Sequence, residues 1–96
     1  MNYIKELNAF RHWLTYNTLS TGAIALWHAL ISVNNGTGWK KQFTVPNPII
    51  QQYTGLSKKG LMQARTQLVE HGLIRYEAGN RSTAPTYEMI SLVERM

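Results

Sequence analysis

Residues 54–74 constrain the fold of this chain more than any other stretch, because both ends of a helix are marked within them. Ser57 is a typical helix N-cap, since its hydroxyl can accept a hydrogen bond from an amide of the first turn. Gly72 can adopt the left-handed conformation that ends a helix, and Leu73 then folds back towards Leu68. The pattern therefore predicts a helix over residues 57–71.

The two faces of this helix differ in character. Apolar side chains at helical spacing predict a buried stripe formed by Leu61, Ala64 and Leu68. Arg65 stands at the edge of this stripe and is left unassigned, because its long side chain can snorkel. The opposite face is polar and basic, and it carries Lys58, Lys59, Met62, Gln63, Thr66 and Gln67. Such a face is typical of the second helix of a helix-turn-helix, which enters a DNA major groove.

The residues on either side of this helix complete a familiar order of elements. Asn47 followed by Pro48 is a helix start signal, with Asn47 expected as the N-cap of a short helix over residues 48–53. A turn at Thr54 and Gly55 then joins this short helix to the one that follows.

A hairpin is expected directly after Gly72. The chain changes to alternating polar and apolar residues, which predicts strands over 73–78 and 86–92, joined by a polar loop over 79–85. With a short strand over 43–45, this hairpin would form a three-stranded antiparallel sheet. We therefore predict an α+β, mostly helical fold: a winged helix-turn-helix with four helices, in which residues 79–85 are the wing.

A first helix is expected over residues 3–16. Its apolar stripe consists of Tyr3, Leu7, Phe10 and Leu14, whereas Trp13 and Tyr16 lie off the stripe. Two interpretations stay open. The aromatic side chains either cover the edge of the core, or they form a self-association surface made of Tyr3, Phe10, Trp13 and Tyr16.

A second helix is expected to be the hub of the core. Residues 23–33, preceded by Ser20 as the N-cap, are apolar almost all round, which is typical of a helix buried on most sides. His28 lies within this segment, and we expect it to be buried and hydrogen-bonded. No second candidate ligand stands four residues away from it, so metal binding is disfavoured.

Composition favours a polyanionic partner and gives little support to catalysis. The 96 residues carry a formal net charge of +5 and no cysteine, which excludes disulfides and thiolate metal sites. The five glutamates are scattered and the three histidines fall on different elements. We therefore expect neither an enzyme nor a metal or cofactor. No apolar run approaches the roughly 18 residues of a membrane span, and the N-terminus lacks the order of a signal peptide, so a cytoplasmic protein is the simplest interpretation.

Each side chain of the proposed DNA surface has an expected role. Lys58 and Lys59, beside the positive end of the helix, would contact phosphates together with Ser57. Base reading would fall to Gln63 and Gln67, because a glutamine amide can pair bidentately with adenine. Met62 or Thr66 offers apolar contact to a thymine methyl. Arg81 and Asn80, at the wing tip, would enter a minor groove or contact phosphate.

The sequence also resembles a known family. Its most specific part is Leu-Trp-His-Ala-Leu at residues 26–30, and the similarity extends over residues 2–6, 19–21, 23–30, 34–35, 43–45 and 54–57. These segments resemble the amino-terminal winged-helix domain of DnaD-like replication proteins, which occur in phages, mobile elements and low-GC Gram-positive bacteria. The resemblance implies a replication-initiation or primosome component in a bacterial or phage-infected cell. It also implies that residues 1–96 form one winged-helix domain of a longer protein.

The expected partner is duplex DNA, bound by a homodimer or a higher homo-oligomer, because a single module with three or four phosphate contacts binds weakly. The resemblance implies a further partner, the replicative helicase or its loader, reached through regions outside this sequence. Two alternatives stay open. One is a self-association module of a replisome-assembly protein with little DNA contact, and the other is a small transcriptional regulator.

Overall fold

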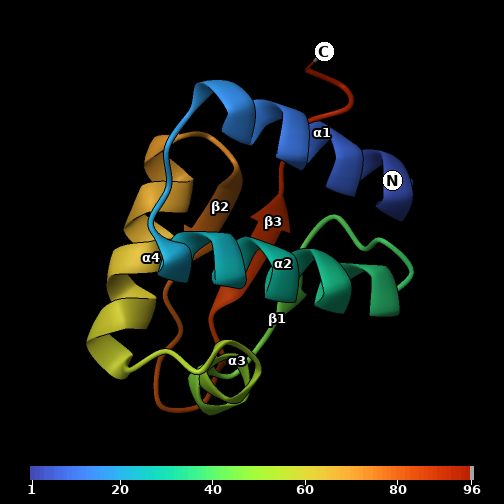
Figure 1. Ribbon diagram of the computed structural model, residues 1–96. Coiled ribbons are helices and arrows are strands. Elements are labelled where there is room, and N and C mark those ends of the chain that lie inside the picture. Colours follow the sequence, from blue (N-terminus) through green and yellow to red (C-terminus); the bar gives the residue numbers. More distant parts are fainter. Residues whose placement is uncertain (96) are drawn as a thin grey trace.

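The structure, a computed structural model, describes residues 1–95. These residues contain four helices and three short strands (Figure 1). In chain order they are α1 (Tyr3–Tyr16), α2 (Thr21–Gly36), β1 (Phe43–Thr44), α3 (Asn47–Thr54), α4 (Lys58–Glu70), β2 (Ile74–Glu77) and β3 (Thr86–Met89). This arrangement confirms the expected α+β class with predominant helix. No helix among these residues is long and apolar enough to cross a membrane.

Side-chain caps determine where most of the helices begin. The Ser57 hydroxyl accepts a hydrogen bond from the amide of Gly60 at 3.0 Å, and Ser20 accepts from Ala23 at 3.1 Å, as the sequence predicted. Helix α4 also ends as predicted. Gly72 has a φ of 69°, and the amide of Leu73 donates to the carbonyl of Leu68 at 2.9 Å, which is the Schellman arrangement.

The start of α3 differs from the prediction. Asn47 was expected to be the N-cap, but Pro46 occupies that position and provides no side-chain hydrogen bond, while Asn47 is already helical. The Asn47 side chain instead accepts a hydrogen bond from Arg65 of α4 at 2.8 Å. A tertiary partner has therefore taken the oxygen that would otherwise cap the helix.

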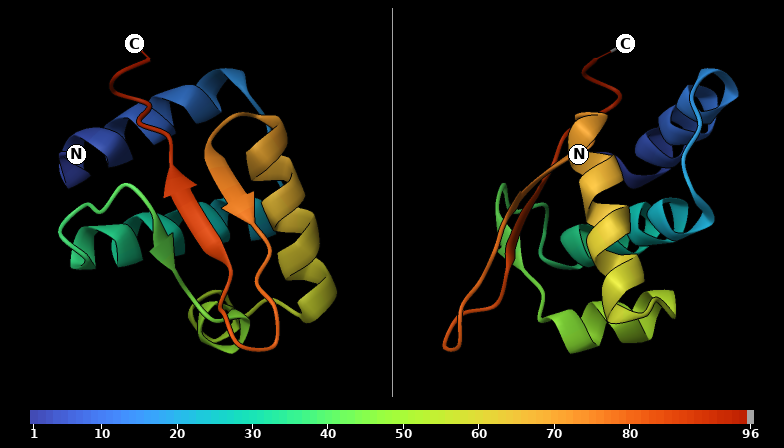
Figure 2. Two further views of the ribbon diagram at one scale, coloured as in Figure 1. Left: turned by 180° about the vertical axis from the view of Figure 1, so that it is seen from behind. Right: turned by 90° about the vertical axis from the view of Figure 1, so that its left-hand side faces the viewer.

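The strands form one antiparallel sheet in the order β1-β3-β2. Tyr87 in the central strand pairs with Phe43 of β1 on one side and with Tyr76 of β2 on the other. The expected three-stranded sheet is confirmed, although all three strands are shorter than predicted. Residues 78–85, which we call the β2–β3 loop, join the two longer strands and extend beyond the sheet (Figure 2).

Helix α2 is the centre of the core. In Figure 1 it lies between α1 above and α3 below, with α4 beside its start and the sheet behind it. The ring of Trp27 stacks on Phe10 of α1, with the ring centroids 3.9 Å apart. This confirms α2 as the hub. His28, however, is exposed rather than buried and hydrogen-bonded, because α2 turns the side that carries His28 and Ser32 to solvent.

The predicted stripe of α1 packs against the core, but the most deeply buried face of the helix is rotated from that stripe towards Glu6 and Ala9. Glu6, Ala9 and Phe10 are its buried residues, whereas Leu7 and Leu14 of the predicted stripe are only half-buried. The reason is the carboxylate of Glu6, which is 2% exposed. It accepts hydrogen bonds from the Ser91 hydroxyl at 2.6 Å and from the amides of Leu92 and Val93 at 2.9 and 3.4 Å. Helix α1 is thus turned so that a charged acceptor meets the turn after β3. These hydrogen bonds join the first helix to the turn after β3.

Candidate nucleic-acid interface

The outer side of α4 presents most of the residues that the sequence predicted for DNA contact. Lys58, Lys59, Met62, Gln63 and Thr66 are all exposed. They follow each other over two turns of the helix, so they form one continuous surface. The Thr66 hydroxyl donates to the main-chain carbonyl of Met62 at 3.0 Å, so the hydroxyl is engaged within the helix and the methyl group is not.

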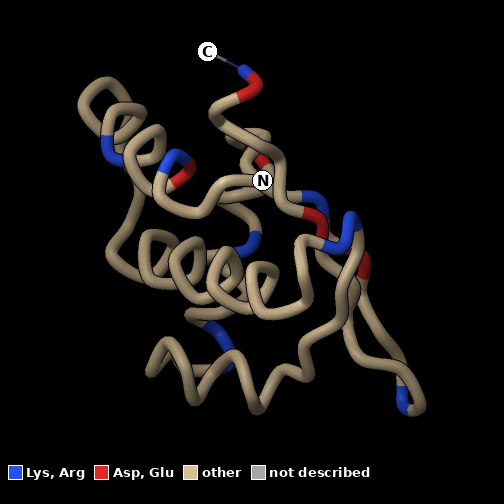
Figure 3. Tube along the Cα trace, turned by 90° about the vertical axis from the view of Figure 1, so that its right-hand side faces the viewer, with Lys and Arg blue, Asp and Glu red and all other residues tan. Residues whose placement is uncertain are grey.

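The charge distribution around α4 is one-sided. No acidic residue occurs between Glu6 and Glu70, so α3, the turn after it and almost all of α4 carry only basic charges. In the view of Figure 3, the lower end of the molecule has blue positions and no red ones. Within residues 1–95, the ion pair is on the sheet, between Arg75 and Glu88 at 2.9 Å. The end of the molecule that contains the start of α4 is therefore suited to a polyanion.

Gln67 is not available for base reading. Its side-chain oxygen accepts from the amide of Ser20 at 2.9 Å, and its side-chain nitrogen donates to the Ser20 hydroxyl at 3.0 Å. Both ends of the amide are thereby used to join α4 to the N-terminus of α2. This corrects the expectation from the sequence, which could not show that Ser20 lies beside the helix.

The β2–β3 loop places Arg81 in solvent but uses Asn80 internally. The side-chain oxygen of Asn80 accepts from the amides of Ser82 and Thr83 at 2.8 and 3.0 Å, so it shapes the tip and is engaged there. Asn80 is therefore a turn residue through its side-chain oxygen, and a DNA contact would fall to its side-chain nitrogen. Arg81 is exposed and makes no hydrogen bond within residues 1–95.

Arg65 is the site residue that the sequence left unassigned. Its Nη1 donates to the side-chain oxygen of Asn47 at 2.8 Å and to the Tyr87 hydroxyl at 3.2 Å. Its guanidinium carbon lies 4.4 Å from the centroid of the Tyr76 ring. Burial raises the pKa of Tyr87, and the hydrogen bond from Arg65 opposes that rise. Arg65 is thus fixed among α3, α4 and the sheet. The sequence signal for this was its place at the edge of the buried stripe of the helix.

Two hollows lie on either side of Met62 and Arg65. One, of about 320 Å³, separates the start of α3 from α4 and is lined by residues that include Asn47 and Lys58. The other, of about 470 Å³, lies between α4 and the sheet and is lined by residues that include Thr66 and Tyr76. The outer side of α4 therefore stands as a ridge between two depressions.

The residues suggested for self-association do not form one exposed surface. Phe10 is 1% exposed, which excludes it as a contact residue. Tyr3 and Trp13 are half-buried, and their rings meet Trp39 and His71 edge-on, with centroids 6.0 and 5.2 Å apart. Of the four, Tyr16 is the exposed one, at 77%. These contacts favour the interpretation that the aromatic side chains cover the edge of the core.

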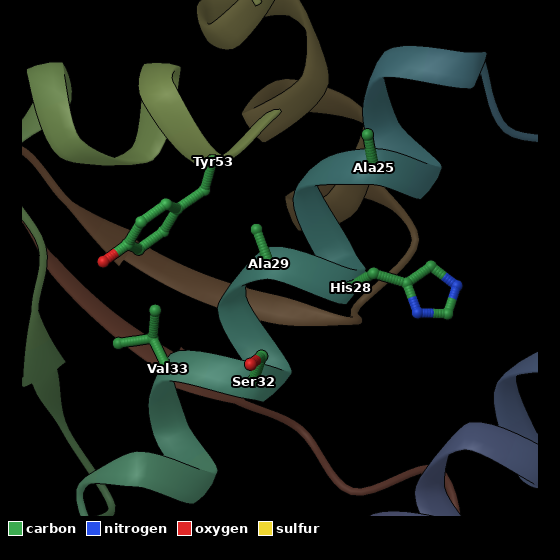
Figure 4. Close-up of a pocket in the computed structure, with 6 residues that line it drawn as sticks. All are labelled: Ala25, His28, Ala29, Ser32, Val33 and Tyr53. Carbon is green, nitrogen blue, oxygen red and sulfur yellow. The ribbon is translucent and has the colours of Figure 1, made fainter. Parts of the chain in front are cut away.

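A further hollow lies over α2. It has a volume of about 630 Å³ and is lined by Ala25, His28, Ala29, Ser32, Val33 and Tyr53. In Figure 4, His28 and Tyr53 lie on opposite sides of the α2 backbone, and small side chains separate them. Although His28 is exposed as a whole, its ring lies edge-on to Phe10 and Trp27, and this partial burial lowers the pKa of His28. The lining has no carboxylate, and no group of three or more His, Cys, Asp or Glu side chains suited to a metal occurs in residues 1–95.

Comparison with protein-family models, curated proteins and solved structures finds no match for this chain. The similarity to DnaD-like proteins therefore stays a proposal based on the residues that carry it.

Proposed function

We propose that this chain is the DNA-binding winged-helix domain of a DnaD-like replication initiator or primosome protein. The recognition helix would be residues 57–71, which include α4, and the wing would be residues 79–85. The observation that carries the proposal is the exposed outer side of α4, which has two lysines at its start and no acid before Glu70. Such a surface attracts phosphates without repelling them elsewhere along the helix.

The order and placement of the elements add support. A short helix, a turn with Gly55 at a φ of 72°, a capped helix and a hairpin follow one another directly. The start of α4 and the β2–β3 loop lie towards the same end of the molecule (Figure 2). A duplex lying across that end would meet both of them, as a major-groove helix and a flanking loop do.

The side chains suggest a division of roles. Lys58, Lys59 and Arg81 would contact phosphates, and Arg81 at its loop tip would also reach a minor groove. Gln63 has a free amide and would read adenine, while the methyl of Thr66 and the side chain of Met62 would meet thymine. The position of the domain on the duplex would therefore depend on Lys58, Lys59 and Arg81. Its preference for a DNA sequence would depend on Met62, Gln63 and Thr66.

A homodimer on DNA, and a helicase or helicase loader as a partner of the full protein, belong to the same proposal. A small transcriptional regulator would use the same surface on a different target. For a self-association module with little DNA contact, Tyr16 is the exposed aromatic side chain that favours it.

The test is duplex binding by fluorescence anisotropy, measured over a range of salt concentrations. We expect Lys58→Ala/Lys59→Ala to weaken binding and to lower the salt dependence by about two units of slope. The matched control is Lys40→Ala/Lys41→Ala, which removes an exposed lysine pair from the loop after α2 and should leave both quantities unchanged. The absence of binding by the wild type at low salt, or equal effects of the two double variants, would contradict the proposal.

A further inference from the structure

Arg65 is a half-buried cation whose direct contacts are all neutral groups. Within residues 1–95 no carboxylate forms an ion pair with it, and its contacts are an amide oxygen, a phenol hydroxyl and an aromatic ring. A guanidinium stays charged at any physiological pH. These neighbours therefore hold the positive charge in place without neutralising it, which is an unusual use of a partly desolvated arginine.

The contacts also leave most of the guanidinium free to bind. A guanidinium has five N–H donors, and the two hydrogen bonds of Arg65 both come from Nη1. Nε and Nη2 donate to no atom of residues 1–95, so three donors remain. The Tyr76 ring and the two oxygens restrict the orientation of the side chain, so little rotamer entropy is left to lose when a ligand binds.

The hollow between α3 and α4 places further positive charge beside Arg65. Lys58 lines it together with Arg65, about 10 Å earlier along the helix axis at 1.5 Å per residue. Asn47 and Pro48, at the start of α3, line it as well. That helix start has no side-chain cap, so no side-chain acceptor offsets the positive end of the α3 dipole near the hollow. No acidic side chain lines the hollow.

We propose that this hollow binds a phosphodiester group of the DNA strand that runs beside α4, with Arg65 as the main contact and Lys58 as the second. The inference rests on the proposed function and adds a defined phosphate site to it. A planar guanidinium with three free donors matches two phosphate oxygens at once. The site lies in the hollow beside the exposed ridge of α4, not on the ridge itself. When the ridge faces base edges, a backbone phosphate would lie in such a position beside it.

Asn47 and Tyr76 are positioning residues in this proposal. They contact Arg65 and hold its orientation, and neither carries a charge. Removing the Asn47 side chain should therefore weaken DNA binding without changing its salt dependence, because the number of phosphates neutralised stays the same. A change at Arg65 itself should alter both the affinity for DNA and its salt dependence.

The experiment measures the Kd and its salt dependence for two duplexes of unrelated sequence. For Arg65→Gln we expect about a tenfold weaker Kd on both duplexes and a slope lower by about one unit. For Asn47→Ala we expect a severalfold weaker Kd with an unchanged slope. The matched control is Arg11→Gln, which removes an exposed arginine from α1 and should change neither quantity.

The outcomes separate this inference from the proposed function. If the wild type does not bind duplex DNA, the proposed function fails. If the wild type binds and the Lys58/Lys59 variant weakens binding, but a folded Arg65→Gln keeps the wild-type Kd and slope, only the phosphate site is overturned. Because Arg65 joins α3, α4 and the sheet, folding is checked by circular dichroism and thermal unfolding. If Arg65→Gln does not fold, Arg65→Lys is measured instead. A wild-type Kd for DNA in Arg65→Lys overturns the site, and a weaker Kd with an unchanged salt-dependence slope supports it.

Discussion

Replacing Glu6 by alanine should destabilise this protein far more than its position in the first helix suggests. The carboxylate is the acceptor for the Ser91 hydroxyl and for the amides of Leu92 and Val93. Ser91 and Leu92 are themselves buried, at 7% and 3% exposure. Alanine would leave one hydroxyl and one amide without a partner in a buried place.

The expected magnitude follows from these two groups. Each buried donor that loses its acceptor costs about 1–3 kcal/mol, so the two donors together should lower the free energy of unfolding of Glu6→Ala by about 2–6 kcal/mol. For a chain of this size that corresponds to a fall in Tm of at least about 8 °C. Glu6→Gln should cost only about 1 kcal/mol, because the amide oxygen can still accept from Leu92 while the amide nitrogen donates to Ser91.

The assay is urea unfolding followed by tryptophan fluorescence, with the free energy taken by linear extrapolation. The matched control is Glu94→Ala, an exposed glutamate beside the same turn, which should stay within about 0.5 kcal/mol of the wild type. If Glu6→Ala unfolds within that same margin, the carboxylate does not hold the turn and the reasoning is wrong. Equal losses for Glu6→Ala and Glu6→Gln would show that the charge matters, rather than the paired donors.

Three further changes test other parts of the structure. Gly79→Ala should distort or destabilise the β2–β3 loop, because its Cβ would clash with the main-chain oxygen of Thr83 across the loop. Gly36→Ala, with open space around it, should keep the wild-type Tm or raise it. Gln67→Ala should lower stability by about 1–2 kcal/mol through the lost link to the start of α2, while Gln63→Ala should leave stability unchanged in urea unfolding and affect only DNA binding. For His28, burial lowers the pKa in the folded state, so protons bind the unfolded state more readily. The contribution of His28 to the free energy of unfolding should therefore be fully present above the unfolded pKa of about 6.5 and be lost as the pH falls through the folded pKa. When Tm is measured from about pH 7 to about pH 5, it should decline less for His28→Gln than for the wild type.

Local signals in the sequence were sufficient to place the starts of α2 and α4 and the end of α4. Ser57 and Ser20 cap amides three residues ahead, and Gly72 ends α4 with bonds to its own last turn. None of these contacts needs knowledge of the rest of the fold. The hairpin followed for the same reason, since its strands alternate and are adjacent in the chain.

Contacts between distant segments were beyond local patterns. Glu6 and Ser91 are 85 positions apart, and Ser20 and Gln67 are 47 apart. A prediction from the hydrophobicity pattern alone treats Glu6 as a surface residue and Gln67 as a free polar side chain, because it cannot include a hydrogen-bond partner from another element. The same limit applies to His28: an almost uniformly apolar helix gives no indication of which side faces solvent.

The link between Gln67 and the start of α2 has a consequence for how this helix can change over evolutionary time. Positions 65 and 67 are committed to holding α4 against its neighbours, so substitutions there carry a folding cost whatever the helix binds. Met62, Gln63 and Thr66 are exposed, and within residues 1–95 their side chains form no hydrogen bond with another element. Divergence in binding preference among descendants of this chain should therefore be concentrated at those three positions, and a selection library that randomises them alone should retain folded members.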